Sequence, residues 1–193
     1  MNLGYAAFRG SGLTGIIIPD KITTIDSLVF DGCADLSSVS LPSSLVAIDR
    51  CAFMSCSSLK KIVIPSAVKS IEEYAFAKCT ELDSVVLGSS LKNIGQRCFV
   101  ASGVRSIKIQ SPVESIGDYA FALCTNLESI SIPNSVKKCG SRQFAGCSSL
   151  RQVVLPDIIK NWKLEDISEL FVGCTSLESV TYSDGTPVRW KSE

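Results

Sequence analysis

Apolar and polar residues follow one another along this chain in a frame that repeats about every 23 residues. Phenylalanine marks the period, because successive phenylalanines lie 22, 23 or, once, 27 residues apart. All eight phenylalanines belong to this series: Phe8, Phe30, Phe53, Phe76, Phe99, Phe121, Phe144 and Phe171. Self-similarity at a fixed period predicts a repeat architecture, with the phenylalanines as a buried stack along the core.

Each repeat carries the same series of apolar positions. In "LVAIDRCAFMSCSSLKKIVIPSA" (45–67), an apolar pair three residues apart precedes the phenylalanine, and a cysteine follows three residues after it. A Leu-x-x-Ile-x-Ile segment then ends at Pro65. The alternation of Ile62, Val63 and Ile64 predicts a short strand with two side chains inward and one outward. Because one repeat cannot bury its own apolar face, the repeats must stack, and their strands must pair in a parallel sheet.

The frame φ-x-x-I-G-x-x-A-F-x-x-C-x-x-L-x-x-I-x-I-P, plainest in "VESIGDYAFALCTNLESISIP" (113–133), closely resembles the BspA-like class of leucine-rich repeats. The resemblance covers nearly the whole chain. It implies a leucine-rich-repeat solenoid, mainly β, with a parallel β-sheet on one face and short helical or irregular turns on the other. It also implies a non-enzymatic, protein-binding and often adhesive module at the surface of bacteria or parasitic protists, or secreted from them. The family has no catalytic residues to transfer.

The two ends of the chain depart from the frame. We divide it into residues 1–158, repeats of about 23 residues with a partial first one, and residues 159–193, a last repeat with an inserted short helix and a C-terminal cap. The insertion "IIKNWKLEDISELF" has four extra residues and apolar residues at helical spacing. At the other end "LGYAAF" aligns with "IGDYAF", so the chain begins inside a repeat. We expect this uncapped N-terminal edge to meet further repeats of a longer array or a partner chain.

One short stretch resembles a nucleotide-binding motif. "GSGLTG" (10–15) fits G-x-G-x-x-G, but "IIIPD" follows it and predicts a strand where a phosphate-binding turn requires a helix. The stretch is better interpreted as a shortened repeat turn. In "FRGSGL" and "FVASGV" serine replaces the cysteine and one residue is deleted, so Gly12 matches Gly103. We expect these glycines to supply the backbone freedom that a tightened turn needs.

Nine cysteines are present, and six occupy one column of the frame. That column is Cys33, Cys56, Cys79, Cys124, Cys147 and Cys174. We interpret it as small buried donors under the turns, with a disulfide ladder or a metal site as alternatives. Cys139 replaces an aliphatic core residue, and we expect Cys51 and Cys98 to be partly exposed.

Composition excludes several functions. The net charge is zero, which gives no electrostatic reason for a nucleic-acid partner, and no apolar run is long enough for membrane insertion. Histidine is absent, and with it the usual general base and the commonest metal ligand. We therefore expect no enzyme, no cofactor and no metal. The first residues resemble no signal peptide, so a cytoplasmic protein, an intracellular scaffold or assembly subunit, is the alternative to an extracellular or cell-surface one.

The candidate binding site lies on the outward strand positions. They are Ile17, Ser40, Val63, Val86, Lys108, Ser131 and Val154, and Thr181 continues the row. Another row, rich in serine, lies two residues earlier in each strand, from Gly15 to Ser179. In most repeats the residue before it belongs to a charged column, which is suited to cross-strand ion pairs. β-Branched and hydroxyl residues also suit strands for their propensity alone. Val63 and Val86, however, predict an exposed apolar strip on adjacent strands, which favours contact with another protein.

Overall fold

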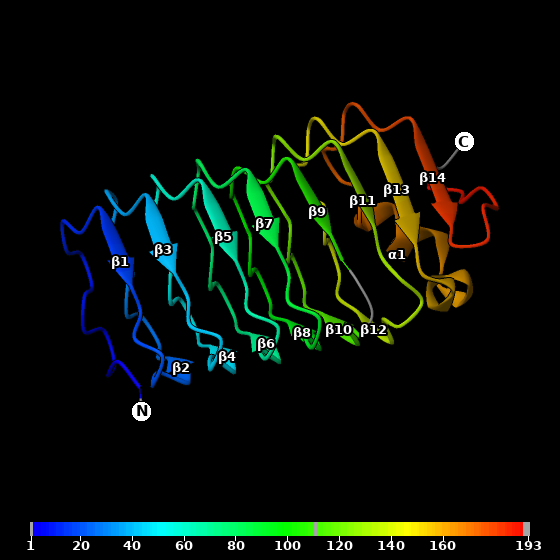
Figure 1. Ribbon diagram of the computed structural model, residues 1–193. Coiled ribbons are helices and arrows are strands. Elements are labelled where there is room, and N and C mark those ends of the chain that lie inside the picture. The colour runs from blue at the N-terminus through cyan, green and yellow to red at the C-terminus, as the bar shows by residue number, and fades with distance from the viewer. Residues whose placement is uncertain (1, 110–111, 191–193) are drawn as a thin grey trace.

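The computed structural model describes residues 2–109 and 112–190 and shows a stack of coils, one for each repeat, that runs from left to right in Figure 1. The front of the stack is a row of parallel strands at the positions that the alternation predicts. They are β1 (Gly15–Ile17), β3 (Ser38–Ser40), β5 (Lys61–Val63), β7 (Ser84–Val86), β9 (Ser106–Lys108), β11 (Ser129–Ser131), β13 (Gln152–Leu155) and β14 (Ser179–Tyr182). Of these, β5, β7, β9, β11, β13 and β14 form one hydrogen-bonded sheet, and β1 and β3 form a separate pair beside it. The predicted solenoid is confirmed.

A second parallel sheet runs along the lower edge of the stack, where the sequence predicted only irregular or helical turns. Its strands have two residues each: β2 (Thr24–Ile25), β4 (Ala47–Ile48), β6 (Ser70–Ile71), β8 (Asn93–Ile94), β10 (Ser115–Ile116) and β12 (Lys138–Cys139). In each strand but β12 the second residue is a buried isoleucine. Two residues are too few to show an alternation, so the pattern alone did not reveal this sheet.

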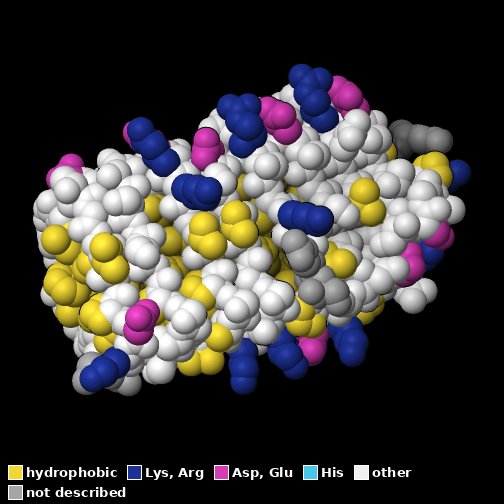
Figure 2. Space-filling view, viewed as in Figure 1, with side chains coloured by type: hydrophobic (Ala, Val, Ile, Leu, Met, Phe, Trp, Pro, Cys, Tyr) yellow, Lys and Arg dark blue, Asp and Glu magenta, His cyan; other side chains and the backbone are white. Residues whose placement is uncertain are grey.

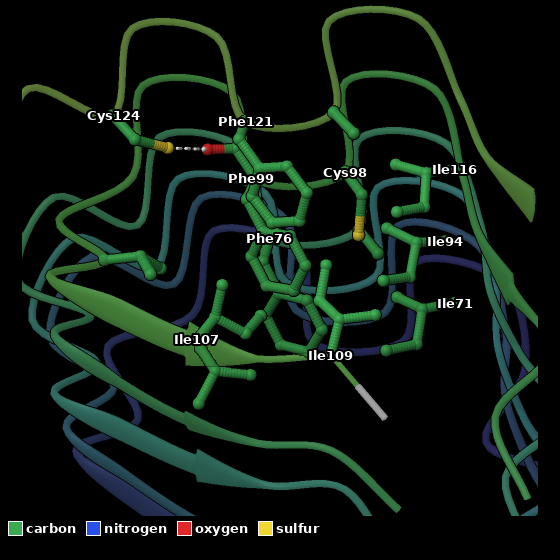
Figure 3. Close-up of a cluster of buried hydrophobic side chains, with 14 of the residues drawn as sticks. Ile71, Phe76, Ile94, Cys98, Phe99, Ile107, Ile109, Ile116, Phe121 and Cys124 are labelled. Carbon is green, nitrogen blue, oxygen red and sulfur yellow. Dashed lines mark hydrogen bonds between the residues drawn. The ribbon is translucent and has the colours of Figure 1, made fainter. Parts of the chain in front are cut away.

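The eight phenylalanines form one continuous stack through the core. Neighbouring ring centroids are 5.1 to 6.1 Å apart and the rings are within 15° of parallel. Phe76, Phe99 and Phe121 lie between the isoleucines of the two sheets (Figure 3). The predicted buried column is therefore confirmed, and only Phe8, in the first repeat, is left half-buried.

The cysteine column joins each repeat to the one before it. Each of its six thiols donates a hydrogen bond to the carbonyl oxygen of the phenylalanine in the repeat before its own, with Sγ–O distances of 3.0 to 3.2 Å. The bond from Cys124 to the carbonyl of Phe99 is drawn in Figure 3. All nine thiols are free, so the disulfide alternative is wrong for this fold. The expectation for Cys51 and Cys98 is also wrong: both are buried, and Cys98 takes the inward place of Ala75 and Ala120.

The turns beside the phenylalanines alternate between right-handed and left-handed backbone. A left-handed residue stands two places before seven of the phenylalanines and two places after all eight, and most of these residues are not glycine. The alternation turns every second N–H group toward the next repeat. Tyr74, Phe76 and Lys78 thus donate to the carbonyls of Gln96, Cys98 and Val100 at 2.8 to 3.0 Å. These bonds offset the cost of about 1–2 kcal/mol for each left-handed side-chain-bearing residue.

The two glycines of the shortened turns do not supply backbone freedom, because neither has a positive φ. A Cβ at Gly103 would collide with the backbone carbonyl of Thr80 in the repeat before it. At Gly12 nothing lies within 4 Å of the same position. Gly103 therefore provides space for the close approach of two repeats, and the expectation of conformational freedom is wrong for both glycines.

The insertion near the C-terminus forms a 3-10 helix, η1 (Asp157–Asn161), and a short α-helix, α1 (Leu164–Glu169). Ile159, Ile167 and Leu170 bury the insertion against the core. Arg142 holds α1 from the previous repeat through two hydrogen bonds to the Glu169 carboxylate, at 3.1 and 3.2 Å.

After β14 the chain folds back along that strand. Val188 donates to the carbonyl of Val180 at 2.9 Å, and Pro187 pairs antiparallel with Thr181. The return thus covers the edge of β14 that faces away from β13. Residues 191–193 of the predicted cap lie outside the described residues. The first repeat differs, because Leu3, Phe8 and Leu13 are only partly covered and β1 pairs on one side.

Candidate functional site

The strands of the front sheet present two rows of side chains to solvent, which together we name the sheet face. The central residue of each strand, such as Ile62, Val85 or Ile107, points into the core, so the residues on either side of it must point outward. The first row is Gly15, Ser38, Lys61, Ser84, Ser106, Ser129, Gln152 and Ser179, and the second is Ile17, Ser40, Val63, Val86, Lys108, Ser131, Val154 and Thr181.

The parallel register aligns the predicted site residues across the strands. Ile17 is paired with Ser40, Val63 with Val86, and Lys108 with Ser131, which is paired in turn with Val154. All seven predicted residues thus lie in one row, with Val154 half-buried and the other six exposed. Their role in binding remains a prediction.

Two stretches of the second row are openly apolar. Ile17 is 81% exposed at the first strand, and Val63 and Val86 are 50% and 48% exposed side by side in the middle of the sheet. In Figure 2 apolar side chains run across the middle of this face, while charged side chains gather along the upper rim, over the turns that enter the strands.

The polar part of the sheet face lines a hollow of about 440 Å³ over β9, β11 and β13. Its polar lining is Ser106, Lys108, Ser129, Ser131 and Gln152, and Val154 stands at one side. Three of these polar residues, Ser106, Ser129 and Gln152, were not among the predicted site residues and were recognised only as members of the serine-rich row. The signal that identifies the hollow is the run of serines in the first row, which leaves room that larger side chains would fill.

The polar side chains of this hollow have no internal partner. No hydrogen bond or ion pair involves the ammonium of Lys108, the hydroxyls of Ser106, Ser129 and Ser131, or the amide of Gln152 within residues 2–109 and 112–190. They differ in this from the serines of the turns, such as Ser44 and Ser57, which donate to backbone carbonyls of the preceding repeat. The hollow therefore presents donors that are free to meet a ligand.

The charged rim is largely neutralised within itself. Arg105 pairs with Glu128 at 2.6 Å, and Arg151 pairs with Glu178 at 2.7 Å, as the alternating column predicted. Lys60 turns away from the column to Glu81, at 3.8 Å. Exposed pairs of this kind contribute little to stability. Because these arginines already occupy Glu128 and Glu178, neither carboxylate pairs with Lys61 or Lys108 of the sheet face, and neither lysine forms an ion pair within the described residues.

Other places in the molecule offer less. A hollow of about 260 Å³ lies beside α1, lined by Cys139, Ser141, Trp162, Asp166 and Glu169, and burial raises the pKa of the Cys139 thiol to about 12. Such a thiol is not a nucleophile at neutral pH. Within the described residues no His, Cys, Asp and Glu side chains gather in a group that could hold a metal ion. No helix there is long and apolar enough to cross a membrane.

Comparison with protein families matches the model described as BspA type leucine rich repeat region, in six copies over residues 1–124 and 92–187. Among solved structures, a leucine-rich repeat protein from Bacteroides ovatus is 33% identical with a TM-score of 0.84, over 96% of this chain and 47% of that one. The chain therefore spans about half the length of that relative. A search of curated proteins finds no match.

Two further structures are similar. A leucine rich repeat protein of T. pallidum is 28% identical with a TM-score of 0.58, over 88% of this chain and 72% of that one. A leucine rich cell surface protein from Faecalibacterium prausnitzii is 22% identical with a TM-score of 0.60, over 94% of this chain and 64% of that one, which shows the fold alone. Together with the repeat geometry, the family match over residues 1–187 shows that the chain belongs to the BspA-type leucine-rich repeat family.

Proposed function

We propose that this protein is a non-enzymatic binding module that recognises another protein through its sheet face, as a surface or secreted adhesin-like protein. The observation that carries the proposal is the pair Val63 and Val86, two half-exposed valines on adjacent strands in the middle of the flat face. Contiguous apolar surface of this kind marks sites of protein contact. The cell-surface description of the F. prausnitzii protein supports the location by similarity of fold only.

A second candidate function is an intracellular scaffold that uses the same face. All nine thiols are free, and the six of the column each need their proton to donate to a carbonyl, which suits a reducing compartment. The compartment of the partner decides between the two functions.

The proposal is tested by capture from the native source with the chain as bait, beside a Val63→Asp/Val86→Asp variant. Two buried charges facing an apolar partner prevent docking, so we expect the partner to be lost. The matched control is Leu123→Asp/Val172→Asp, which puts the same charges on turn residues of similar exposure, 54% and 57%. If the sheet-face variant captures as much partner as the native chain does, the proposal is overturned.

A further inference from the structure

We propose that the hollow over β9, β11 and β13 binds a carboxylate, supplied by an aspartate or glutamate side chain of an extended acidic segment in the protein partner. The inference rests on the proposed function and goes beyond it, since it states the chemistry of the segment that is bound.

The first support is the set of donors that the strands bring together. The register pairs Ser106 with Ser129 and Ser129 with Gln152, and it pairs Lys108 with Ser131 in the second row. Three hydroxyls, one amide and one ammonium thus line a single hollow of about 440 Å³, and none of them has a partner within the described residues. A carboxylate accepts several hydrogen bonds at once, and those from a charged donor are the strongest.

The second support is the charge of the sheet face. Its two rows carry two cations, Lys61 and Lys108, and no acidic residue. At the rim Arg105 and Arg151 neutralise Glu128 and Glu178, and Asp83, at the entrance to β7, is the rim carboxylate without an ion pair in the described part of the chain. The face therefore has an excess of positive charge, which complements an acidic partner.

The third support is the arrangement of apolar and basic residues. Neighbouring strands are about 4.8 Å apart, and side chains on one side of an extended peptide recur about every 6.7 Å. An apolar residue seated over Val63 and Val86 thus places the next side chain on the same side near Lys108, one strand further on. The lining of the hollow contains no aromatic ring on which a sugar could stack, which favours a peptide over a glycan.

The test begins with a displayed library of random peptides of about twelve residues, long enough to cross the eight strands. We expect the native chain to select peptides with Asp or Glu two positions from an apolar residue. A synthetic peptide of the selected sequence and its Glu-to-Gln version are then titrated into the protein by calorimetry. The inference is overturned if the selected peptides lack acidic residues, or if the protein binds the acidic peptide and its Glu-to-Gln version with equal affinity.

Matched variants locate the site. We expect Lys108→Gln to weaken the acidic peptide roughly tenfold and Lys61→Gln to weaken it less, since Lys61 lies outside the hollow. Lys137→Gln makes the same charge change away from the sheet face and should leave affinity unchanged. Affinity should also fall between about 50 and 300 mM NaCl, because salt screens exposed charges. Unchanged affinity for Lys108→Gln overturns the inference.

The outcomes separate this inference from the proposed function. If partner capture depends on Val63 and Val86 while acidic peptides do not bind, the proposed function stands and the carboxylate site does not. If a sulfated oligosaccharide binds through Lys108 and acidic peptides do not, the hollow is an anion site for glycans and the peptide inference is overturned. If acidic peptides bind and no partner depends on the sheet face, the hollow takes carboxylates but the proposed function fails.

Discussion

The turn side and the sheet face of this solenoid are built from the same repeats but use their side chains differently. On the turn side, thiols donate to phenylalanine carbonyls, and Arg97 lies between the rings of Tyr74 and Tyr119, 5.6 and 4.9 Å from their centroids. On the sheet face, the serine hydroxyls of the hollow and the Lys108 ammonium form no hydrogen bond or ion pair within the described residues. The difference teaches that the side chains of the turn side join neighbouring repeats, whereas on the sheet face the backbone alone makes the hydrogen bonds between strands and leaves the polar side chains of the hollow available for binding.

The largest expected effect is on the phenylalanine stack. Phe76→Ala removes a fully buried ring from between two others and should lower the free energy of unfolding by about 3–5 kcal/mol. Val86→Thr on the sheet face should change it by less than about 0.5 kcal/mol. Urea denaturation followed by circular dichroism measures both. Similar losses in the two variants contradict the division between the sides.

A smaller effect is expected at the shortened turns. Gly103→Ala places a methyl group against the carbonyl of Thr80, so the repeats must separate there, at a cost of about 1–3 kcal/mol. Gly12→Ala is the matched control, because the equivalent position in the first repeat is open and its φ is not left-handed. It should stabilise slightly, by less than about 1 kcal/mol. If the two substitutions change the free energy of unfolding equally, close packing of the repeats is not the reason why glycine occupies position 103.

The smallest effect is the pH dependence of the thiols. Burial raises the pKa of Cys124 and Cys174 to about 11 and that of Cys79 to about 12, from an ordinary value of 9.0. Above pH 9 the unfolded chain releases protons that the folded chain retains. The stability from these groups is therefore complete below pH 9 and is lost as the pH rises toward 11 and 12.

This dependence is measured by urea denaturation between about pH 8 and pH 10, where the decline begins. A Cys124→Ser variant removes one of the titrating groups, and its stability should fall less steeply with pH than that of the native chain. Parallel slopes for the two proteins indicate that the other titrating side chains, and not the thiols, cause the decline.

Much of the fold follows from the repeat period alone. The spacing of Phe53 and Phe76 placed the buried stack, and the alternation at Ile62 and Val63 placed the strand and its outward residue. Such patterns suffice because each repeat stacks on a copy of itself, so one register determines all the others. The rows of the sheet face were predictable for the same reason.

The features that were missed depend on how neighbouring repeats approach one another. The burial of Cys98, the space required at Gly103 and the left-handed turns at Tyr74 and Lys78 come from backbone contacts with residues about one repeat away. The two-residue strands of the second sheet are likewise too short to show a period. None of these contacts can be recognised from the residue pattern of a single repeat.

The sequence by itself determined the repeat, its period, the buried columns and the residues of the two exposed rows, because hydrophobic burial acts on every repeat in the same way. Only the tertiary structure decided which polar side chains find partners. Ser44 and Ser106 are the same residue type, yet one donates to a carbonyl of the preceding repeat and the other lines the hollow beside Lys108. The reason is physical: a hydrogen bond depends on distance and direction between neighbouring repeats, which residue type does not specify.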